Sequence, residues 1–165
     1  MRGGAVAKRS AGLLLYRQRP SGIEVFLVHP GGPFWAAKDR GAWTIPKGEY
    51  WDDEPALEAA RREFNEETGF DETGFAAEAE FLALGTITQA SGKIVSAWAV
   101  EGDCDPGKLI SNTCQVRWPP RSGKWIEIPE VDRGAWFSLA EARGRIIEAQ
   151  RDFLDRLVQV VSGAS

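Results

Sequence analysis

The sequence predicts an α/β protein in which a mixed β-sheet carries helices. Two observations lead to this prediction. Short apolar runs bounded by turn-forming residues are typical of strands, and two segments with helix-capping signals interrupt them. The 165 residues, 43% hydrophobic and 27% charged, suit one globular core better than two. We therefore expect a single domain over residues 1–165, with its core at about 9–162.

The first quarter of the chain predicts a pair of strands. The apolar runs 12–16 and 24–29 flank the turn-forming cluster Pro20-Ser21-Gly22, so we expect them to pair with each other. A loop rich in glycine and proline is expected over 30–42, because such residues interrupt regular structure. A short strand is expected after it, at 43–45.

A helix is predicted next, because signals mark both of its ends. Asp52 and Asp53 stand just before Glu54-Pro55, where a capping carboxylate and a proline in the first turn favour helix initiation. The helix is expected to end at about Thr68. Gly69 then suits the left-handed backbone conformation that ends many helices.

The second half of the chain adds further strands. The runs 81–88 and 94–100 flank a turn at 90–93 and predict a hairpin. The stretch 102–124 contains several glycines and prolines, so we expect an irregular loop of a length that often carries function. Two short extended segments are expected after this loop, at 125–128 and 135–137.

The C-terminal part predicts helical structure. Ser138 and Glu141 match a capping box, in which the first residue caps a helix and the second reaches back to it. Further on, apolar residues repeat at helical spacing and predict a final amphipathic helix: Leu154, Leu157, Val158 and Val161.

Composition excludes several classes of protein. Twenty Lys and Arg against 24 Asp and Glu leave a net charge of −4, which argues against a broad basic face for nucleic acid. Cys104 and Cys114 are too few for a disulfide scaffold, and the single histidine, His29, excludes a His-rich zinc site. Residues 1–9 show no apolar signal segment, and no apolar run reaches about 18 residues. We therefore expect a cytoplasmic protein without a membrane partner.

Three glutamates fall on one stripe of the central helix. At about 100° per residue, Glu63, Glu66 and Glu67 are neighbours at spacings of three and four, where like charges repel. A divalent cation is a natural partner, because hard carboxylate oxygens suit magnesium and manganese. The alternative is a solvated acidic face that is balanced by the helix's own cations, Arg61 and Arg62.

These glutamates belong to a longer pattern, G-x5-E-x7-R-E-U-x-E-E-x-G-U, where U is a bulky apolar residue. Every fixed position is filled over residues 48–70, by Gly48, Glu54, Arg62, Glu63, Phe64, Glu66, Glu67, Gly69 and Phe70. Chance would give such a match at fewer than about one start in 10⁸. The segment resembles the Nudix box, the signature of the Nudix hydrolases. The order of strands and helices over about 9–162 is also similar to that of this family.

The resemblance implies a Nudix-type α/β/α sandwich, with the mixed sheet between helices. It also implies an enzyme acting on phosphoric anhydride bonds, which uses water and Mg²⁺ or Mn²⁺ to cleave a nucleoside diphosphate linked to a group X. Carried over position by position, Glu63, Glu66 and Glu67 would hold the metal ion.

The other positions of the box are implied to support this site. Arg62 would orient the neighbouring glutamates, and Glu54 would brace the loop–helix–loop or bind metal through water. Gly48 and Gly69 would serve backbone geometry at the two ends of the helix. A backbone carbonyl near Lys47 or Gly48 is a further candidate ligand.

The base that activates water is less fixed, because members of this family recruit it from different places. Within the box, Glu66 and Glu67 are candidates for this role. Outside it, Glu127 and Glu130 are candidates, and the alternative for each of these two is a surface charge in a loop.

Candidate substrate contacts lie outside the box. Lys47 stands at its entrance, where it would either meet a substrate phosphate or be a surface charge. The entrance Pro46-Lys47-Gly48 is similar to that of the Nudix enzymes acting on diadenosine polyphosphates. Trp43 is a candidate for stacking on a base, although most tryptophans fill cores.

The loop 102–124 is a second candidate contact region. Arg121 and its basic neighbours alternate with Trp118 and Trp125, which would form a clamp over phosphates and base. The alternative is a solvated loop with the tryptophans packed underneath.

The sequence therefore predicts a pyrophosphohydrolase dependent on Mg²⁺ or Mn²⁺, with a small-molecule nucleotide as its partner. Nucleoside triphosphates and dinucleoside polyphosphates are expected ahead of nucleotide sugars. Two alternatives stay open: hydrolysis of RNA 5′ ends, which the net charge of −4 disfavours, and a sensing module that binds a nucleotide without cleaving it. The complete stripe of glutamates favours catalysis over sensing. Nothing in the sequence indicates an oligomeric state.

Overall fold

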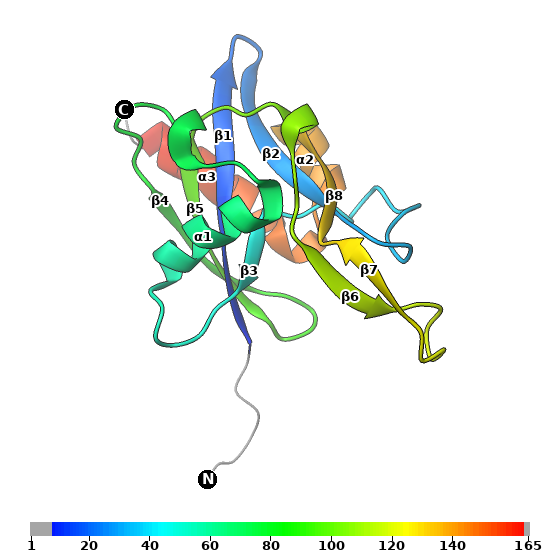
Figure 1. Ribbon diagram of the computed structural model, residues 1–165. Helices are drawn as coiled ribbons and strands as arrows, with labels where there is room; N and C mark the ends of the chain where they lie inside the picture. Colours follow the sequence, from blue (N-terminus) through cyan, green and yellow to red (C-terminus); the bar gives the residue numbers. More distant parts are fainter. Residues whose placement is uncertain (1–7, 164–165) are drawn as a thin grey trace.

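A mixed sheet of six strands forms the centre of the protein: β1 (Arg9–Arg19), β2 (Gly22–Pro30), β3 (Lys47–Glu49), β4 (Leu82–Thr88), β5 (Ile94–Glu101) and β8 (Val131–Ser138). The computed structural model describes residues 8–163 (Figure 1). Five strands follow the order β4-β5-β1-β2-β8, and β3 pairs with β1 outside this order. β1 and β5 run parallel, whereas the other neighbours run antiparallel.

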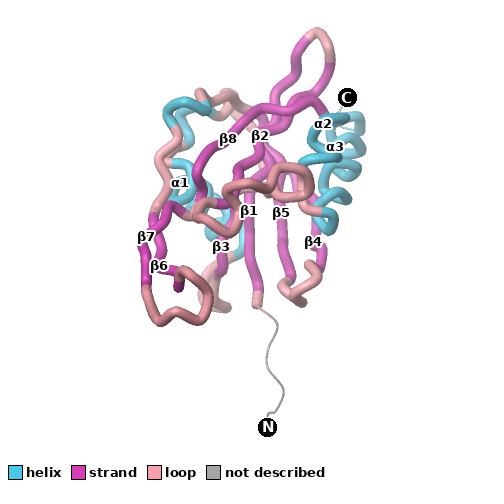
Figure 2. Tube along the Cα trace, turned by 90° about the vertical axis from the view of Figure 1, so that its right-hand side faces the viewer, coloured by secondary structure: helices cyan, strands magenta, loops and turns pink. Residues whose placement is uncertain are grey.

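Helices cover both faces of this sheet (Figure 2). α1 (Ala56–Thr68) packs on one face, and α2 (Leu139–Arg145) and α3 (Arg151–Gly163) pack on the other. Because successive residues of a strand point to opposite faces, Leu13 of β1 joins the core under α1, and Leu14 joins the core under α2 and α3. The α/β/α sandwich with a mixed sheet between helices is thus confirmed.

The end of α1 agrees with the sequence, but its start does not. Gly69 adopts the left-handed conformation, with φ of 77°, and ends the helix as predicted. At the start, Pro55 occupies the N-cap position instead of the first turn, and no side chain caps the helix. The predicted capping by Asp52 or Asp53 is therefore wrong. The Asp52 carboxylate instead forms an ion pair with Arg9 of β1.

The strand predicted at 43–45 is displaced along the chain. Trp43 and Thr44 form only isolated bridges, and regular pairing with β1 begins at Lys47, opposite Gly12. A Cβ atom on Gly12 would lie 2.5 Å from the carbonyl oxygen of the residue before Lys47. The glycine therefore permits the close approach that fixes β3 against β1.

A two-stranded sheet lies where the sequence predicts an irregular loop. β6 (Thr113–Arg117) pairs antiparallel with β7 (Trp125–Pro129), so the prediction of an irregular loop is wrong at residues 113–117, whereas the extended segment predicted at 125–128 is confirmed. The sequence of β6, Thr-Cys-Gln-Val-Arg, alternates polar and apolar residues over only five positions and has one strongly apolar residue, Val116, so its strand signal is short. In Figure 1 the β6–β7 hairpin projects away from the central sheet.

The remaining predicted elements are confirmed within a few residues. β1 pairs with β2, and β4 pairs with β5. Ser138 caps α2 by accepting a hydrogen bond from the backbone N–H of Glu141. Leu154 and Leu157 are buried on α3. Between residues 8 and 163 the structure also has three single 3₁₀ turns: η1 (Glu72–Gly74), η2 (Pro106–Lys108) and η3 (Glu148–Gln150).

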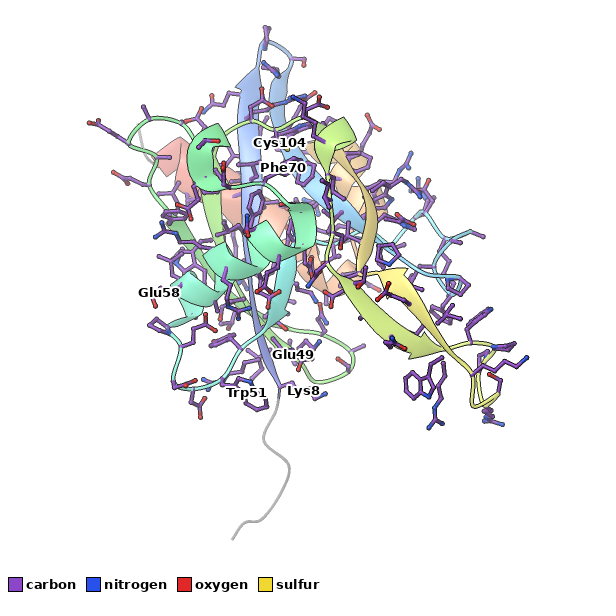
Figure 3. All side chains as sticks on the ribbon, in the orientation of Figure 1. Lys8, Glu49, Trp51, Glu58, Phe70 and Cys104 are labelled. Carbon is purple, nitrogen blue, oxygen red and sulfur yellow. The ribbon has the colours of Figure 1, made fainter. Side chains whose placement is uncertain are left out.

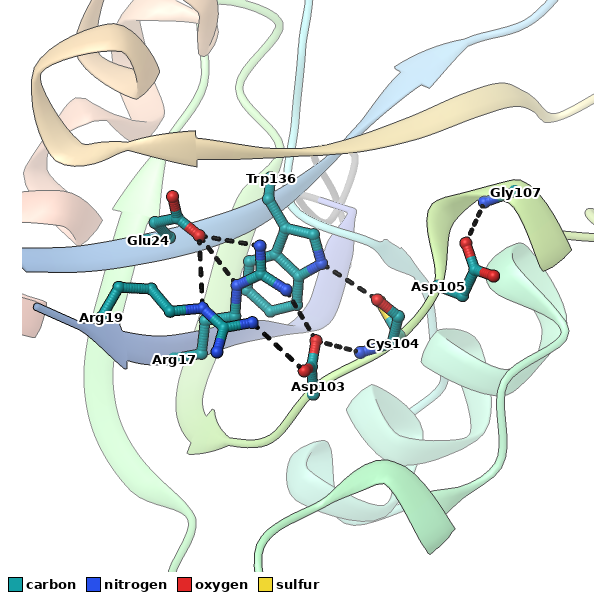
Figure 4. Close-up of polar contacts among 8 residues, drawn as sticks. All are labelled: Arg17, Arg19, Glu24, Asp103, Cys104, Asp105, Gly107 and Trp136. Carbon is teal, nitrogen blue, oxygen red and sulfur yellow. Dashed lines mark hydrogen bonds and ion pairs between the residues drawn. The ribbon is translucent and has the colours of Figure 1, made fainter. Parts of the chain in front are cut away.

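A polar cluster joins the far end of β1 to the segment after β5 (Figure 4). Arg17 donates hydrogen bonds to Glu24 and to Asp103, both at 2.8 Å, and its guanidinium lies 4.1 Å from the ring centroid of Trp136. The indole N–H of Trp136 donates to the carbonyl of Cys104. Burial raises the pKa of the Cys104 thiol to about 12, so this free cysteine stays protonated at neutral pH.

No helix within residues 8–163 is both long enough and apolar enough to cross a membrane. Residues 1–7, which carry most of the N-terminal segment considered above, lie outside the described part of the chain, as do residues 164–165.

Candidate active site

A polar cavity of about 400 Å³ opens beside the C-terminal half of α1. Its walls come from segments that are far apart in the sequence: Ser10, Lys47, Gly48, Glu49, Glu63, Glu66, Glu67, Lys93, Asn112 and Glu130. Figure 3 labels Glu49 at the β3 side of this region, and Glu58 on the outer side of α1, away from it. Glu63, Glu66 and Glu67 thus line the same cavity as Glu130.

Glu63 is the least exposed of the glutamates on α1, at 8%. Its carboxylate packs directly on the backbone of Gly48 in β3. A Cβ atom on Gly48 would lie 2.0 Å from the carboxyl carbon of Glu63, so any side chain at position 48 would collide with this carboxylate. Gly48 is therefore required by close contact, since its backbone does not adopt a left-handed conformation.

Arg62 connects the glutamates along one side of α1. Its guanidinium donates two hydrogen bonds to the carboxylate of Glu54, both at 2.9 Å. The Nη1 atom also donates to Glu63 at 2.8 Å and to Glu66 at 3.1 Å. Arg62 therefore contacts Glu63 and Glu66 but not Glu67, and Glu54 holds Arg62 from the other side.

Glu67 reaches the edge of β3. Its Oε1 atom accepts a hydrogen bond from the backbone N–H of Lys47 at 3.2 Å. Burial raises the pKa of the Glu67 carboxyl to about 8, against the opposing effect of that hydrogen bond and of the Lys47 ammonium. The pKa of Lys47 is lowered, first by burial and then by the charge of Lys93.

Backbone hydrogen bonds bring Glu130 to this helix. The N–H of Asn112 donates to the carbonyl of Glu66 at 3.0 Å, and the N–H of Glu130 donates to the carbonyl of Asn112 at 2.9 Å. Burial and the charge of Glu66 raise the pKa of Glu130. Of the two external glutamates considered from the sequence, Glu130 therefore reaches the cavity.

Negative charge is in excess in the polar cavity, because five glutamates and two lysines line it. Within residues 8–163, no three carboxylate, imidazole or thiol side chains converge tightly enough to form a metal site as they stand. The carboxylates are held apart because Glu63 and Glu66 accept hydrogen bonds from Arg62, whereas Glu67 accepts one from the backbone of Lys47. The donor set nevertheless fits magnesium or manganese, which prefer hard carboxylate oxygens.

An apolar cavity of about 490 Å³ lies next to the polar one. The two cavities share Lys47, Glu67 and Glu130. Apolar side chains form much of the remaining wall, among them Trp35, Ile128, Val131 and Ile147. The site therefore has a charged end and an apolar end, which suits a ligand with a polyanionic part and a planar or apolar part.

Three residues that the sequence predicts to contact the substrate or to act as the base lie outside both cavities. Trp43 is 3% exposed, its indole N–H donates to Asp39 at 2.7 Å, and its ring packs edge-on against Phe137. Its predicted role as a substrate contact is wrong, because a ring covered by the core cannot stack on a base. Glu127 and Arg121 are exposed on the β6–β7 hairpin and line neither cavity.

Two residues that line the cavity, Glu49 and Lys93, have no signal in the sequence. The Nζ atom of Lys93 lies 3.1 Å from Oε2 of Glu49. The two residues meet because β3 and β5 pair with opposite edges of β1, at Ser10 and its neighbours. Only the topology of the sheet, and no local pattern, brings them to the cavity.

The sequence of the chain matches a known protein family. The sequence profile of the NUDIX domain family matches residues 6–157, which is most of the chain. The chain belongs to the Nudix family. It is therefore a Nudix hydrolase, an enzyme that acts on pyrophosphate bonds, and the box over residues 48–70 lies within the matched region.

Solved structures show the same Nudix fold. An Ap4A hydrolase of C. elegans in a binary complex superimposes with a TM-score of 0.64 and 22% identity, covering 95% of this chain and 99% of that one. The NUDIX domain of Shewanella oneidensis NrtR, complexed with ADP ribose, gives 0.60 and 15%, covering 96% and 90%. The Nudix hydrolase RenU of M. smegmatis gives 0.59 and 20%, covering 94% and 86%.

Replacing Gly48 with alanine is expected to push the Glu63 carboxylate out of place. Hydrolysis should slow at least about tenfold, the usual minimum effect of disturbing what orients a metal ligand. The free energy of unfolding should fall by about 1–3 kcal/mol, the cost of an extra methyl group in a filled space. Steady-state kinetics and thermal unfolding measure both effects, and wild-type values in both would mean that Glu63 does not pack on β3.

Proposed function

We propose that this Nudix hydrolase uses Mg²⁺ or Mn²⁺ to cleave a nucleoside diphosphate linked to a group X. The observation that carries the proposal is the union of two cavities. Glu63, Glu66, Glu67 and Glu130 line the polar cavity, and this opens into an apolar cavity large enough for a nucleoside. Phosphates would occupy the first cavity, and the nucleoside would occupy the second.

The glutamates of the box are the proposed metal ligands, and their neighbours position them. Glu63, Glu66 and Glu67 would bind the ion, while Arg62, held by Glu54, keeps the glutamate carboxylates on the cavity side of α1. A bound divalent ion would supply positive charge to the phosphoryl oxygens and orient the attacking water. Lys47, which lines both cavities, would contact a substrate phosphate.

Glu130 is the proposed general base. Its carboxyl lines both cavities, so it lies where the polyphosphate would join the nucleoside. Its raised pKa moves its proton affinity toward neutral pH, as catalytic bases require. We assign Glu66 and Glu67 to the metal ion and not to the role of base. Glu127 is exposed on the hairpin and lines neither cavity, so it does not contact a substrate bound there.

Nucleoside triphosphates and dinucleoside polyphosphates are the proposed substrates, ahead of nucleotide sugars. Two observations support this order. The structural neighbour from C. elegans is an Ap4A hydrolase, and the walls of the apolar cavity include Trp35, a side chain suited to stacking on a base. A sugar would need a second set of hydroxyl partners, whereas apolar residues dominate this wall.

Cleavage of a substrate panel tests the proposal. We expect hydrolysis of at least one nucleotide class with Mg²⁺ or Mn²⁺, and loss of this activity with chelator. Chromatography should detect the two products, a nucleoside monophosphate and X-phosphate: pyrophosphate from a nucleoside triphosphate, a second nucleotide from a dinucleoside polyphosphate, and a sugar phosphate from a nucleotide sugar. The panel contains nucleoside triphosphates, dinucleoside polyphosphates, nucleotide sugars, and capped or triphosphorylated RNA. Metal-dependent binding without turnover of any of them would contradict the proposal and would favour a sensing module.

A further inference from the structure

A third cavity lies beyond the two that the proposed function uses. It measures about 300 Å³ and lies between the loop after β2 and the β6–β7 hairpin. It shares Gly31, Trp35 and Ile128 with the apolar cavity, which itself shares three residues with the polar one. We call it the outer pocket. The three cavities form one row, which leads from the glutamates of α1 to the hairpin.

Aromatic rings from two separate segments line the outer pocket. Phe34 and Trp35 come from the loop after β2, and their rings meet edge to face at a centroid distance of 5.0 Å. Trp118 comes from the end of β6 and is half-buried. The Nζ atom of Lys38 lies 3.7 Å from the ring centroid of Phe34, so a positive charge stands beside these rings. Phe34 is 56% exposed, which leaves its ring free to contact a ligand.

Two glycines hold this loop against the hairpin. The N–H of Gly31 donates to the carbonyl of Glu130 at 3.0 Å. A Cβ atom on Gly31 would lie 2.0 Å from the carbonyl oxygen of Pro129, and one on Gly32 would lie 2.6 Å from Cδ1 of Ile128. Side chains at these positions would therefore push the loop off β7. The close packing of the loop on β7 therefore shapes the outer pocket, and one residue of its wall, Gly31, is hydrogen-bonded to the backbone of Glu130.

The hairpin presents different residues to the pocket and to solvent. Half-buried Val116 and Ile128 alternate with exposed neighbours, as expected for strands that have one covered face. Trp125 is 56% exposed, is not part of the pocket wall, and lies with its ring centroid 5.1 Å from the guanidinium of Arg117. The hairpin thus carries one tryptophan inside the pocket, Trp118, and one outside it.

Building on the proposed function, we propose that the outer pocket binds a second nucleobase of the substrate. The phosphates and the first nucleoside would occupy the polar and apolar cavities, so the next planar group would lie between Phe34, Trp35 and Trp118. Aromatic side chains can stack on any of the nucleobases, because every base has a π-face. A volume of about 300 Å³ suits a group of this size.

Two kinds of substrate carry such a base. It is either the far base of a dinucleoside polyphosphate, brought back by the flexible phosphate chain, or the second base of a 5′-triphosphorylated dinucleotide. Both present the same chemistry to the pocket, a planar heteroaromatic ring joined to the first nucleotide through phosphate. A nucleoside triphosphate has one base and leaves the outer pocket unused.

The test compares Trp118→Ala with Trp125→Ala in the full-length enzyme with Mg²⁺. The substrates are a dinucleoside tetraphosphate, a triphosphorylated dinucleotide and the matching nucleoside triphosphate. We expect Trp118→Ala to raise KM for a two-base substrate about 5- to 150-fold, the loss of one base–aromatic stack. KM for the nucleoside triphosphate should stay within about twofold. Trp125→Ala should leave all three values unchanged, and Trp118→Phe should restore most of the affinity.

Each outcome decides the proposal. A selective loss on either two-base substrate supports it and identifies which of the two fills the pocket. An equal loss on the one-base substrate, no loss at all, or the same loss in Trp125→Ala overturns it. If wild-type protein cleaves nothing, the proposed function fails, and calorimetric binding of the same ligands to the same variants still tests the outer pocket by itself.

Discussion

Glu67→Gln is expected to lower kcat of metal-dependent hydrolysis by at least about 10²-fold and to leave the fold intact. Glutamine keeps the size of the side chain and an oxygen that can accept the Lys47 N–H bond, so local geometry is retained. It removes the negative charge that a metal ion or a transferred proton requires, and loss of such a group costs about 10²–10⁴ in rate. Glu67 belongs to neither core cluster, so the substitution should change the free energy of unfolding little.

Glu58→Gln is the matched control for this variant. Glu58 lies on the same helix but is exposed on its outer side (Figure 3). We expect its kcat to stay within about twofold of wild type, because surface substitutions away from special features have small effects. Stopped-assay kinetics at saturating Mg²⁺ and circular dichroism give the two readouts. A folded Glu67→Gln enzyme with full activity would refute the role assigned to Glu67.

The pH dependence of stability provides a second readout of the same variant. Burial raises the pKa of Glu67 from 4.5 to about 8 in the metal-free protein, so the folded state holds this proton more tightly than the unfolded state. The stabilisation is therefore complete below about pH 4.5 and is lost as pH rises through 8. We expect the unfolding midpoint of metal-free wild type to fall over this window, and Glu67→Gln to lack that contribution.

The core of the candidate site could be predicted from the sequence because its geometry is local. Spacings of three and four residues on a helix place Glu63, Glu66 and Glu67 on one stripe, whatever surrounds the helix. Gly69 ends that helix through its own backbone conformation. The contact of Arg62 with Glu66 follows from the same spacing of four residues. Local periodicity thus fixes both the helix and the direction of its acidic face.

The parts of the site that the sequence missed depend on long-range pairing. Lys93 meets Glu49 because β1 lies between β3 and the start of β5, and Trp43 is buried because residues distant in sequence, among them Phe137 of β8, pack on it. β6 falls in the stretch predicted as a loop, because its alternation extends over only five residues and it pairs only with β7, in a sheet separate from the central one. Contacts between residues so far apart leave no periodic signal.

Phe64→Ala is expected to act on stability, in contrast to the change at Glu67. The Phe64 ring is 1% exposed, and its centroid lies 5.6 Å from that of Phe75 and 6.4 Å from that of Phe70. Removing it leaves a cavity between α1 and the sheet, at a cost of about 3–5 kcal/mol. For a domain of this size, the unfolding midpoint should fall by about 6–20 °C.

Phe34→Ala is the control for this loss, because it makes the same substitution at a ring that is 56% exposed. Its free energy of unfolding should change by about 0.5 kcal/mol or less. Below its lowered midpoint, Phe64→Ala should keep measurable hydrolysis, since the carboxylate of the adjacent Glu63 is held by Arg62 and packs on Gly48 independently of the ring. Unchanged thermal stability would mean that this face of α1 does not pack on the sheet, and α1 could then not present its glutamates to the cavity.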